Sequence, residues 1–239
     1  MVDYLPKGSL LLTDFGYFGF QWFDALTQAG LYFVSRLRQK TTFDIIEVLY
    51  QDDKVLDALV WLGTYRADRA RFSVRLIHYH HNGLQRSFIT NVLDPRVLSL
   101  ADIATCYARR WDIEMMFNLI KTHLKLHLLW SSKLTVVLHQ VFAVFTIAQV
   151  ILGLRSDIAT RAKADPFEVS LDLLVRWVPR LAADGLDPVA TLVERGRLAG
   201  FIRPSSRLKL SLPSLDLARY AFPSSFVPLQ RTPRYAGKT

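Results

Sequence analysis

The sequence predicts an α/β fold, and three observations support that prediction. Residues 9–13 (SLLLT) form a short apolar run ending at Asp14, as expected of a buried parallel strand. Residues 19–30 follow with apolar side chains at helical spacing and end in a glycine, and residues 31–37 (LYFVSRL) have the composition of a second strand. Strand, helix and strand in this order build parallel sheets, so Asp14 should lie at a strand's carboxyl end, where such sheets hold their sites.

A β-rich segment is expected next, over about residues 41–95. It contains several apolar runs, and the last two are separated by Asn82 and Gly83. Asn-Gly between such runs is a strong hairpin signal because both turn positions need positive φ. We therefore predict a β-rich subdomain inserted between the opening unit and the helices that follow.

Helical patterns dominate the second half of the chain. Residues 99–125 have helical periodicity, with Ser99 as the N-cap and Asp102 at the capping-box position. Residues 134–154 predict a second long helix, and weaker amphipathic segments follow residue 155. The chain should therefore contain a C-terminal helical extension.

The charge of the chain favours a polyanionic partner. The formal net charge is +9 and the pI is near 9.8, and clustered Lys and Arg gain affinity by releasing counterions from phosphates. The cations are spread along the chain, which favours nucleic acid over a membrane surface.

The boundaries predicted from these patterns give three parts. They are an α/β domain over residues 1–155, a helical segment over 156–202 and a basic tail over 203–239. The tail is rich in Pro, Ser and Arg, so we expect it to be partly disordered and to add non-specific DNA affinity. Its cations are Arg203, Arg207, Lys209, Arg219, Arg231, Arg234 and Lys238.

Two features bear on the cellular setting. Cys106 is the only cysteine, which excludes an internal disulfide and a multi-cysteine zinc site and suggests a reducing, cytoplasmic location. The run 134–154 is long and apolar enough to suggest a transmembrane helix. However, His139, Gln140 and Gln149 interrupt it, so a buried core helix is preferred and a small membrane protein is the less favoured alternative.

Three histidines in the expected hairpin invite a metal interpretation. His78 and His80 point to the same strand face, and His81 follows them. No further cysteine or histidine cluster completes such a site, so a polar hairpin surface is preferred.

Four polar residues on the 99–125 helix form the main candidate site. At ~100° per residue, Tyr107, Arg110, Glu114 and Lys121 fall within an arc of about 60°. Taken alone, such a set is usually a solvated ion-pair face. It also suits phosphodiester cleavage, because a carboxylate can hold Mg²⁺ or Mn²⁺ while cations grip neighbouring phosphates.

The spacing of these four residues carries a family resemblance. The string YARRWDIEMMFNLIK contains Tyr-x2-Arg-x3-Glu-x6-Lys and resembles the signature of insertion-sequence family 4 transposases, of the Asp-Asp-Glu class. Average residue usage would produce this spacing about once in 10⁵ start positions. Residues 10–38 are similar to the family's strand with the second catalytic Asp, its helix and the next strand, so the resemblance covers about residues 10–155.

The resemblance implies a ribonuclease-H-like integrase or transposase core and a two-metal reaction in which water or a DNA 3′-hydroxyl attacks phosphorus. Asp14 and Glu114 would be the catalytic metal ligands, binding Mg²⁺ or Mn²⁺. Tyr107, Arg110 and Lys121 would contact phosphates near the transposon end. The partner would be double-stranded DNA, with a homodimer on paired ends and a cytoplasmic, nucleoid-associated location.

Further DNA contacts are expected beside the motif. Arg109 and Lys125, with His127 and Lys133, continue a basic path along the same helix and its exit. Solvated charges are the equally weighted alternative. Trp111 and Trp130 could stack on an unpaired base, although each is more often a core residue.

The chain departs from the family at its start. The family's first catalytic Asp lies well upstream of the second, and only thirteen residues precede Asp14. Asp3 is too close and has a loop-like context. We therefore expect an N-terminally truncated, incomplete fold that does not cleave DNA by itself. A non-catalytic DNA-binding remnant is the alternative.

Overall fold

The structure is a computed structural model that describes residues 4–205 and 212–232. Contacts divide the chain into two compact units. Unit 1 comprises Met1–Arg110 and Leu210–Thr239, and unit 2 comprises Trp111–Lys209. Each unit is described by itself.

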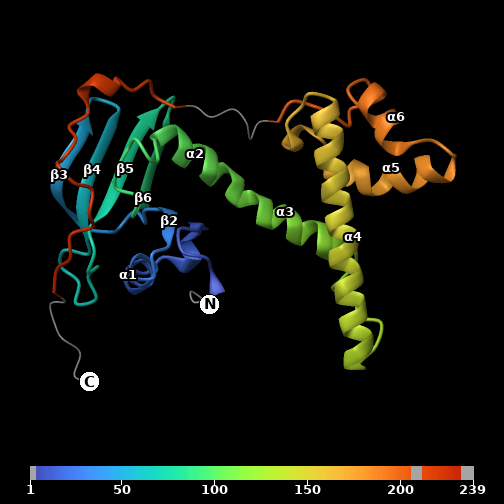
Figure 1. The fold of residues 1–239 in the computed structure, drawn as a ribbon, viewed down its shortest axis with the longest axis horizontal. Coiled ribbons are helices and arrows are strands. Elements are labelled where there is room, and N and C mark those ends of the chain that lie inside the picture. Colours follow the sequence, from blue (N-terminus) through green and yellow to red (C-terminus); the bar gives the residue numbers. More distant parts are fainter. Residues whose placement is uncertain (1–3, 206–211, 233–239) are drawn as a thin grey trace. The chain divides into compact units, whose positions relative to one another are not determined.

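Unit 1 is built on a mixed six-stranded sheet with the order β1-β2-β6-β5-β4-β3 (Figure 1). β1 and β2 are parallel, and every other neighbouring pair is antiparallel. The strands are β1 (Leu10–Thr13), β2 (Tyr32–Arg36), β3 (Phe43–Gln51), β4 (Val55–Leu62), β5 (Val74–His81) and β6 (Leu84–Thr90).

The opening strand, helix and strand are confirmed. α1 (Phe20–Gln28) connects β1 to β2, and its buried side chains include Phe23 and Leu26. Gly30 has φ +70, a conformation that lets the chain reverse at low steric cost after the helix. Asn91 then ties this unit to the sheet, because its side-chain amide accepts from Phe33 N at 3.0 Å and donates to the carbonyl of Leu31 at 2.8 Å.

The β-rich segment exists, but it is not a separate subdomain. The hairpin between β5 and β6 turns at Asn82 and Gly83, with φ values of 48 and 73, as the Asn-Gly signal predicts. β6 also pairs with β2, with Val34 opposite Thr90. Pairing satisfies the backbone groups that β2 would otherwise expose at an edge, so the segment extends the same sheet.

The two faces of the sheet are covered differently. α1 packs on one face against side chains such as Phe33, Val60 and Ile89. α2 (Leu100–Ala108) contributes Leu100 and Ile103 to the core of the other face. A residue of this sheet can therefore be assigned to a face from the cluster in which it is buried.

Residues 212–232, within the tail predicted to be partly disordered, pack on unit 1. After a short 3₁₀ helix, η7 (Leu217–Arg219), Ala221 N donates to Leu49 O at 2.8 Å, and Arg231 N donates to Arg71 O at 2.8 Å. The Tyr220 hydroxyl donates to buried Asp57 at 3.0 Å. Amino-acid composition does not predict these hydrogen bonds, because the partner residues lie far away along the chain.

The correction applies to residues 212–232. Within them, Arg231 donates to the carbonyls of Ala70 and Leu62 at 2.8 and 2.7 Å, and Arg219 donates to Gln51 O at 3.1 Å. Both arginines therefore hold the C-terminal segment to the rest of unit 1 through hydrogen bonds to backbone carbonyls. Arg207, Lys209, Arg234 and Lys238 lie outside the described residues.

Unit 2 is helical. Its core joins α4 to α5 and α6 through buried residues that include Ile158, Leu174 and Leu192. The elements are α3 (Asp112–Asn118), a π-helical turn η4 (Leu119–His123), α4 (Leu134–Arg161), η5 (Pro166–Glu168), α5 (Leu171–Ala183) and α6 (Pro188–Arg195).

The compact units do not divide at residues 155 and 202, where composition changes. α4 continues through residue 155, and its Arg155 side chain donates to Val169 O at 3.1 Å. The C-terminal part of this helix forms one hydrophobic core with the segments that follow it. The predicted boundary at residue 155 therefore falls inside one compact unit.

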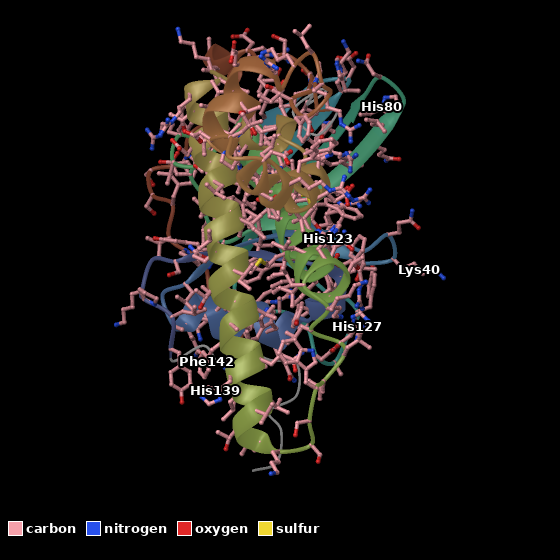
Figure 2. All side chains as sticks on the ribbon, turned by 90° about the vertical axis from the view of Figure 1, so that its right-hand side faces the viewer. Lys40, His80, His123, His127, His139 and Phe142 are labelled. Atoms are coloured by element: carbon pink, nitrogen blue, oxygen red, sulfur yellow. The ribbon has the colours of Figure 1, made fainter. Side chains whose placement is uncertain are left out.

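The long helix predicted over 134–154 is present as α4, but it is not a buried core helix. Gln140, Val144 and Ala148 form its buried stripe, whereas Phe142 is 68% and Val150 57% exposed. Figure 2 shows Phe142 as a labelled side chain on this helix. Among the described residues, α4 is the one helix whose length and composition would allow it to cross a membrane.

Candidate functional site

Asp14 lies directly after β1 and caps a short 3₁₀ helix, η2 (Phe15–Tyr17). Its Oδ1 accepts from Phe15 N at 2.7 Å, and its side chain is 50% exposed. The turn-forming role that such an Asp often has is therefore present here. The position at a strand's carboxyl end still leaves the carboxylate accessible to a ligand.

Arg110 and Tyr107 lie beside Asp14. The Arg110 guanidinium donates to the second Asp14 oxygen, with NH1 to Oδ2 at 3.4 Å, and its side chain is only 14% exposed. The same guanidinium lies 5.8 Å from the centre of the Tyr107 ring, which packs edge-on against Phe88 at 5.1 Å. The structure thus brings three of the predicted site residues together.

The electrostatics keep Tyr107 neutral. Burial raises the pKa of its phenol, and the Arg110 and Arg36 charges oppose that rise. At neutral pH the hydroxyl is therefore a hydrogen-bond donor beside a cation. A donor next to a guanidinium suits a phosphate oxygen better than a metal ion.

The helix predicted over 99–125 is interrupted. α2 ends at Ala108, a 3₁₀ turn follows over Arg109–Trp111, and α3 passes into the π-helical turn over Leu119–His123. A 3₁₀ helix advances about 120° per residue and a π-helix less than an α-helix. The common arc of about 60° therefore does not hold for all four motif residues.

The four motif residues fall into different units. Tyr107 and Arg110 belong to unit 1, whereas Glu114 and Lys121 belong to unit 2. Glu114 lies in the first turn of α3. Lys121 is exposed in the π-helical turn, with its ammonium 5.5 Å from the Phe117 ring centre. The motif thus spans the junction between two compact units.

The other expected DNA contacts are exposed. Arg109 and Lys125 are both exposed, and Lys125 has φ +57 where the π-helical turn has ended. Trp111 is 49% and Trp130 81% exposed, so neither occupies the core position that tryptophan more often has. Their DNA-binding roles stay predictions.

Asp14 and Glu114 carry the donor type that a divalent metal prefers. Carboxylate oxygens such as those of Asp14 and Glu114 are the ligands that Mg²⁺ prefers. No group of three His, Cys, Asp or Glu side chains placed to hold a metal occurs among the described residues. Within unit 1, both Asp14 oxygens already accept hydrogen bonds, so a bound ion would compete with Arg110.

Two arginines near Asp14 were not singled out from the sequence. Arg38 donates to Phe15 O at 2.6 Å, and Arg36 lies 5.2 Å from the Phe15 ring centre. Both hold the turn that Asp14 caps. The signal was available, because parallel β1 and β2 place Thr13 opposite Ser35, so residues just after each strand meet at one sheet edge.

Ser99 positions the helix that carries Tyr107, and its removal should be measurable. The Ser99 hydroxyl donates to Asp102 at 2.6 Å and accepts from Asp102 N at 3.1 Å. We expect Ser99→Ala to lower the free energy of unfolding by about 1 kcal/mol at pH 7. Urea denaturation followed by circular dichroism measures this change.

The destabilisation caused by Ser99→Ala should depend on pH. Hydrogen bonds from Ser99 hold the pKa of the Asp102 carboxyl below its usual value of 3.8. That stabilisation is present above the unfolded pKa and is lost as pH falls through the folded pKa. The cost of Ser99→Ala should therefore shrink in acid. Ser170→Ala is the control, because that hydroxyl caps Leu173 N at 3.5 Å. An equal pH trend in both variants would contradict the assignment.

Comparison with known proteins gives one family. A family model described as a transposase DDE domain matches residues 1–150. No curated protein and no solved structure matches the chain significantly. The matched range contains Asp14, Arg110 and Glu114.

Proposed function

Since the chain belongs to the transposase DDE-domain family, we propose that it is the end-binding and catalytic part of an insertion-sequence family 4 transposase. The family transfers phosphodiester bonds and acts on DNA. The observation that carries the proposal is the grouping of Asp14, Arg110 and Tyr107 at the carboxyl ends of β1 and β2. It combines a potential metal ligand with two phosphate-binding groups.

The proposed architecture is ribonuclease-H-like. The parallel β1-α1-β2 unit with antiparallel β6 beside β2 supports it. Among the described residues, β1 is at the edge of the sheet. A further strand added at that edge would satisfy its backbone groups and would bring a side chain next to Asp14.

The proposed roles follow from charge and exposure. Tyr107, Arg110 and Lys121 bind phosphates near the transposon end, with Arg109, Lys125 and Trp130 as flanking contacts. Asp14 and Glu114 hold Mg²⁺ or Mn²⁺. When bound, the metal pair activates the attacking oxygen and stabilises the leaving one.

We propose that residues 1–239 bind DNA without cleaving it. A two-metal site needs ligands shared between its ions, and two carboxylates are few for this purpose. A third carboxylate would come from polypeptide outside residues 1–239, at the edge of β1. The alternative is a non-catalytic remnant, which would bind ends whether or not that strand is supplied.

A cleavage assay tests this proposal. The purified chain is incubated with Mg²⁺ and duplexes ending in the sequences of its own element. We expect binding without nicking, and nicking once the chain is extended by an N-terminal strand with an Asp encoded upstream. Nicking by the chain alone that Glu114→Ala abolishes would contradict the need for a third carboxylate. Binding without nicking by the extended chain would favour the remnant.

Salt dependence tests the phosphate contacts. We expect Lys121→Gln to weaken binding to all duplexes about equally and to reduce the slope of log affinity against log salt by about 1. Fluorescence anisotropy at several salt concentrations measures both. Arg195→Gln is the control, because it removes one exposed unit 2 charge outside residues 1–150. The same slope change in both variants would show a general charge effect.

We further propose a cytoplasmic protein that acts as a homodimer on paired DNA ends, without membrane insertion. The apolar exposed face of α4 makes the last point worth testing. After cell lysis and carbonate washing, the chain should be in the soluble or DNA-bound fraction. Retention in the washed membrane would instead favour a membrane protein built around α4.

A further inference from the structure

Lys121 lies in the π-helical turn η4, and the segment after this turn binds its carbonyls. The last carbonyls of a helix have no partner within the helix and accept hydrogen bonds from other groups. Two carbonyls of this turn accept from backbone amides, in the pairs Leu124 N to Leu119 O at 2.9 Å and Leu126 N to Ile120 O at 3.1 Å. The next carbonyl is that of Lys121, and a side chain binds it.

That side chain is His127, which lies on the segment between η4 and α4 (Figure 2). Its Nδ1 lies 2.6 Å from Lys121 O. A carbonyl oxygen only accepts hydrogen bonds, so Nδ1 carries the proton and donates. Lys125 has φ +57, in the left-handed region, and the reversal of the chain there lets the ring reach back to the turn. His127 therefore closes the turn that presents Lys121.

A buried amide on α4 holds the segment that carries His127. Gln140 is only 6% exposed. Its Nε2 donates to Leu128 O at 2.7 Å, and its Oε1 accepts from Trp130 N at 3.2 Å. Leu128 follows His127 directly, so these bonds fix the backbone from which the ring reaches Lys121. Gln140 interrupts the apolar run of α4, and this restraint gives a buried polar side chain its hydrogen-bond partners.

The side chain of Lys121 has a restraint of its own. Its ammonium lies 5.5 Å from the ring centre of Phe117, which precedes it on α3. Lys121 is exposed, and it forms no ion pair with a carboxylate in the part of the chain that the structure describes. The backbone and the ammonium are thus both held, while the charge is available to a phosphate.

We propose that His127 is a positioning residue for DNA binding, because its Nδ1–H fixes the backbone of Lys121 while Lys121 binds a phosphate. The inference rests on the proposed function, in which Lys121 makes that contact. It also changes the role expected of His127, since the ring donates to the fold through Nδ1 and acts on DNA through Lys121. Holding the cation in place before DNA arrives lowers the conformational entropy that is lost on binding.

A double-mutant cycle on the full chain tests this role. Fluorescence anisotropy measures binding of a duplex with the end sequence of the element to the unmodified chain, His127→Ala, Lys121→Gln and the double variant. We expect His127→Ala to weaken binding at least ~3-fold, and to add no further loss where Lys121→Gln is already present. A direct phosphate contact by His127, or a general loss of stability, would instead multiply the two losses. Multiplied losses, or unchanged binding by His127→Ala, would overturn the inference.

His127→Asn is the conservative variant. An Asn amide nitrogen can take the place of Nδ1 and donate to Lys121 O, whereas the longer Gln side chain places its amide one bond further away. His127→Asn should therefore keep most of the affinity, and His127→Gln should lose as much as His127→Ala. Equal losses in all three variants would overturn the assignment of Nδ1–H as the positioning group.

His139→Ala is the matched control. It removes an exposed histidine of α4 in the same unit (Figure 2). This variant should bind the duplex as the unmodified chain does. A loss equal to that in His127→Ala would show that removing either histidine has the same effect and would overturn the specific role of His127.

Hydrogen exchange without DNA distinguishes failure of the inference from failure of the proposed function. The Leu126 amide donates to Ile120 O, so its protection reports the closed turn. We expect His127→Ala to speed exchange at Leu126 at least ~10-fold and His127→Asn to restore the protection. Unchanged exchange in His127→Ala would overturn the inference and leave the proposed function standing. Faster exchange with no duplex binding even by the unmodified chain would overturn the proposed function, and the inference with it.

Discussion

Asp57→Asn should lower the free energy of unfolding by about 3–5 kcal/mol, because it leaves a buried cation without its counter-charge. Asp57 accepts from Arg75 Nε at 2.8 Å and from NH2 at 2.6 Å, and both side chains are fully buried. The remaining Arg75 nitrogen donates to Leu98 O at 2.6 Å. Asn preserves the shape of the site, so the loss isolates the charge.

Urea denaturation of the full chain, followed by the circular dichroism of the sheet, measures this effect. Asp68→Asn is the control. It breaks the Arg66–Asp68 pair, whose side chains are 62% and 46% exposed, and exposed pairs contribute about 0–1 kcal/mol. Similar losses in both variants would show that the buried pair has no special role.

Tyr220 extends this network to the C-terminal segment. Burial and the Asp57 charge raise the pKa of its phenol well above the ordinary value of 10. The stabilisation is therefore fully present below pH 10 and is lost as pH rises through the folded pKa. Tyr220→Phe should lower the free energy of unfolding by about 1–2 kcal/mol. This variant should also lack the part of the stability loss above pH 10 that comes from ionisation of Tyr220. An unchanged alkaline loss would contradict the assignment.

Glu114→Gln should reduce DNA cleavage by at least ~10²–10³-fold in the extended, cleavage-competent enzyme, because a metal ligand that stabilises transition-state charge is lost. Binding of the DNA end should change little, since the phosphate contacts are kept. Single-turnover cleavage with Mg²⁺ separates the two effects. Glu194→Gln, an exposed Glu of α6 outside residues 1–150, is the matched control.

Asp14→Asn makes an independent test of the same site. Asn keeps an oxygen that can accept from Phe15 N, so the turn after β1 should persist. The carboxylate charge is removed, and with it the pairing with Arg110. Cleavage should fall as it does in Glu114→Gln. Full cleavage by either variant would exclude that residue as a metal ligand.

Much of the candidate site could be located from sequence because its residues lie at predictable ends of elements. Asp14 follows a buried strand, and α2 carries Tyr107 after the Ser99 capping box. Spacing and periodicity could not predict the proximity of Asp14 and Arg110, because the two residues are 96 positions apart. Only the family resemblance placed them in one site.

The sequence by itself determined the features that depend on local chemistry. The β1-α1-β2 unit, the Asn82-Gly83 turn and the Ser99 cap all follow from spacing and from residues with restricted or permissive backbones. Only the tertiary structure decided that β6 joins β2, that Tyr220 binds Asp57 and that α4 buries one stripe. Those outcomes depend on which distant groups can satisfy each other's hydrogen bonds and charges, and one sequence does not specify such pairings.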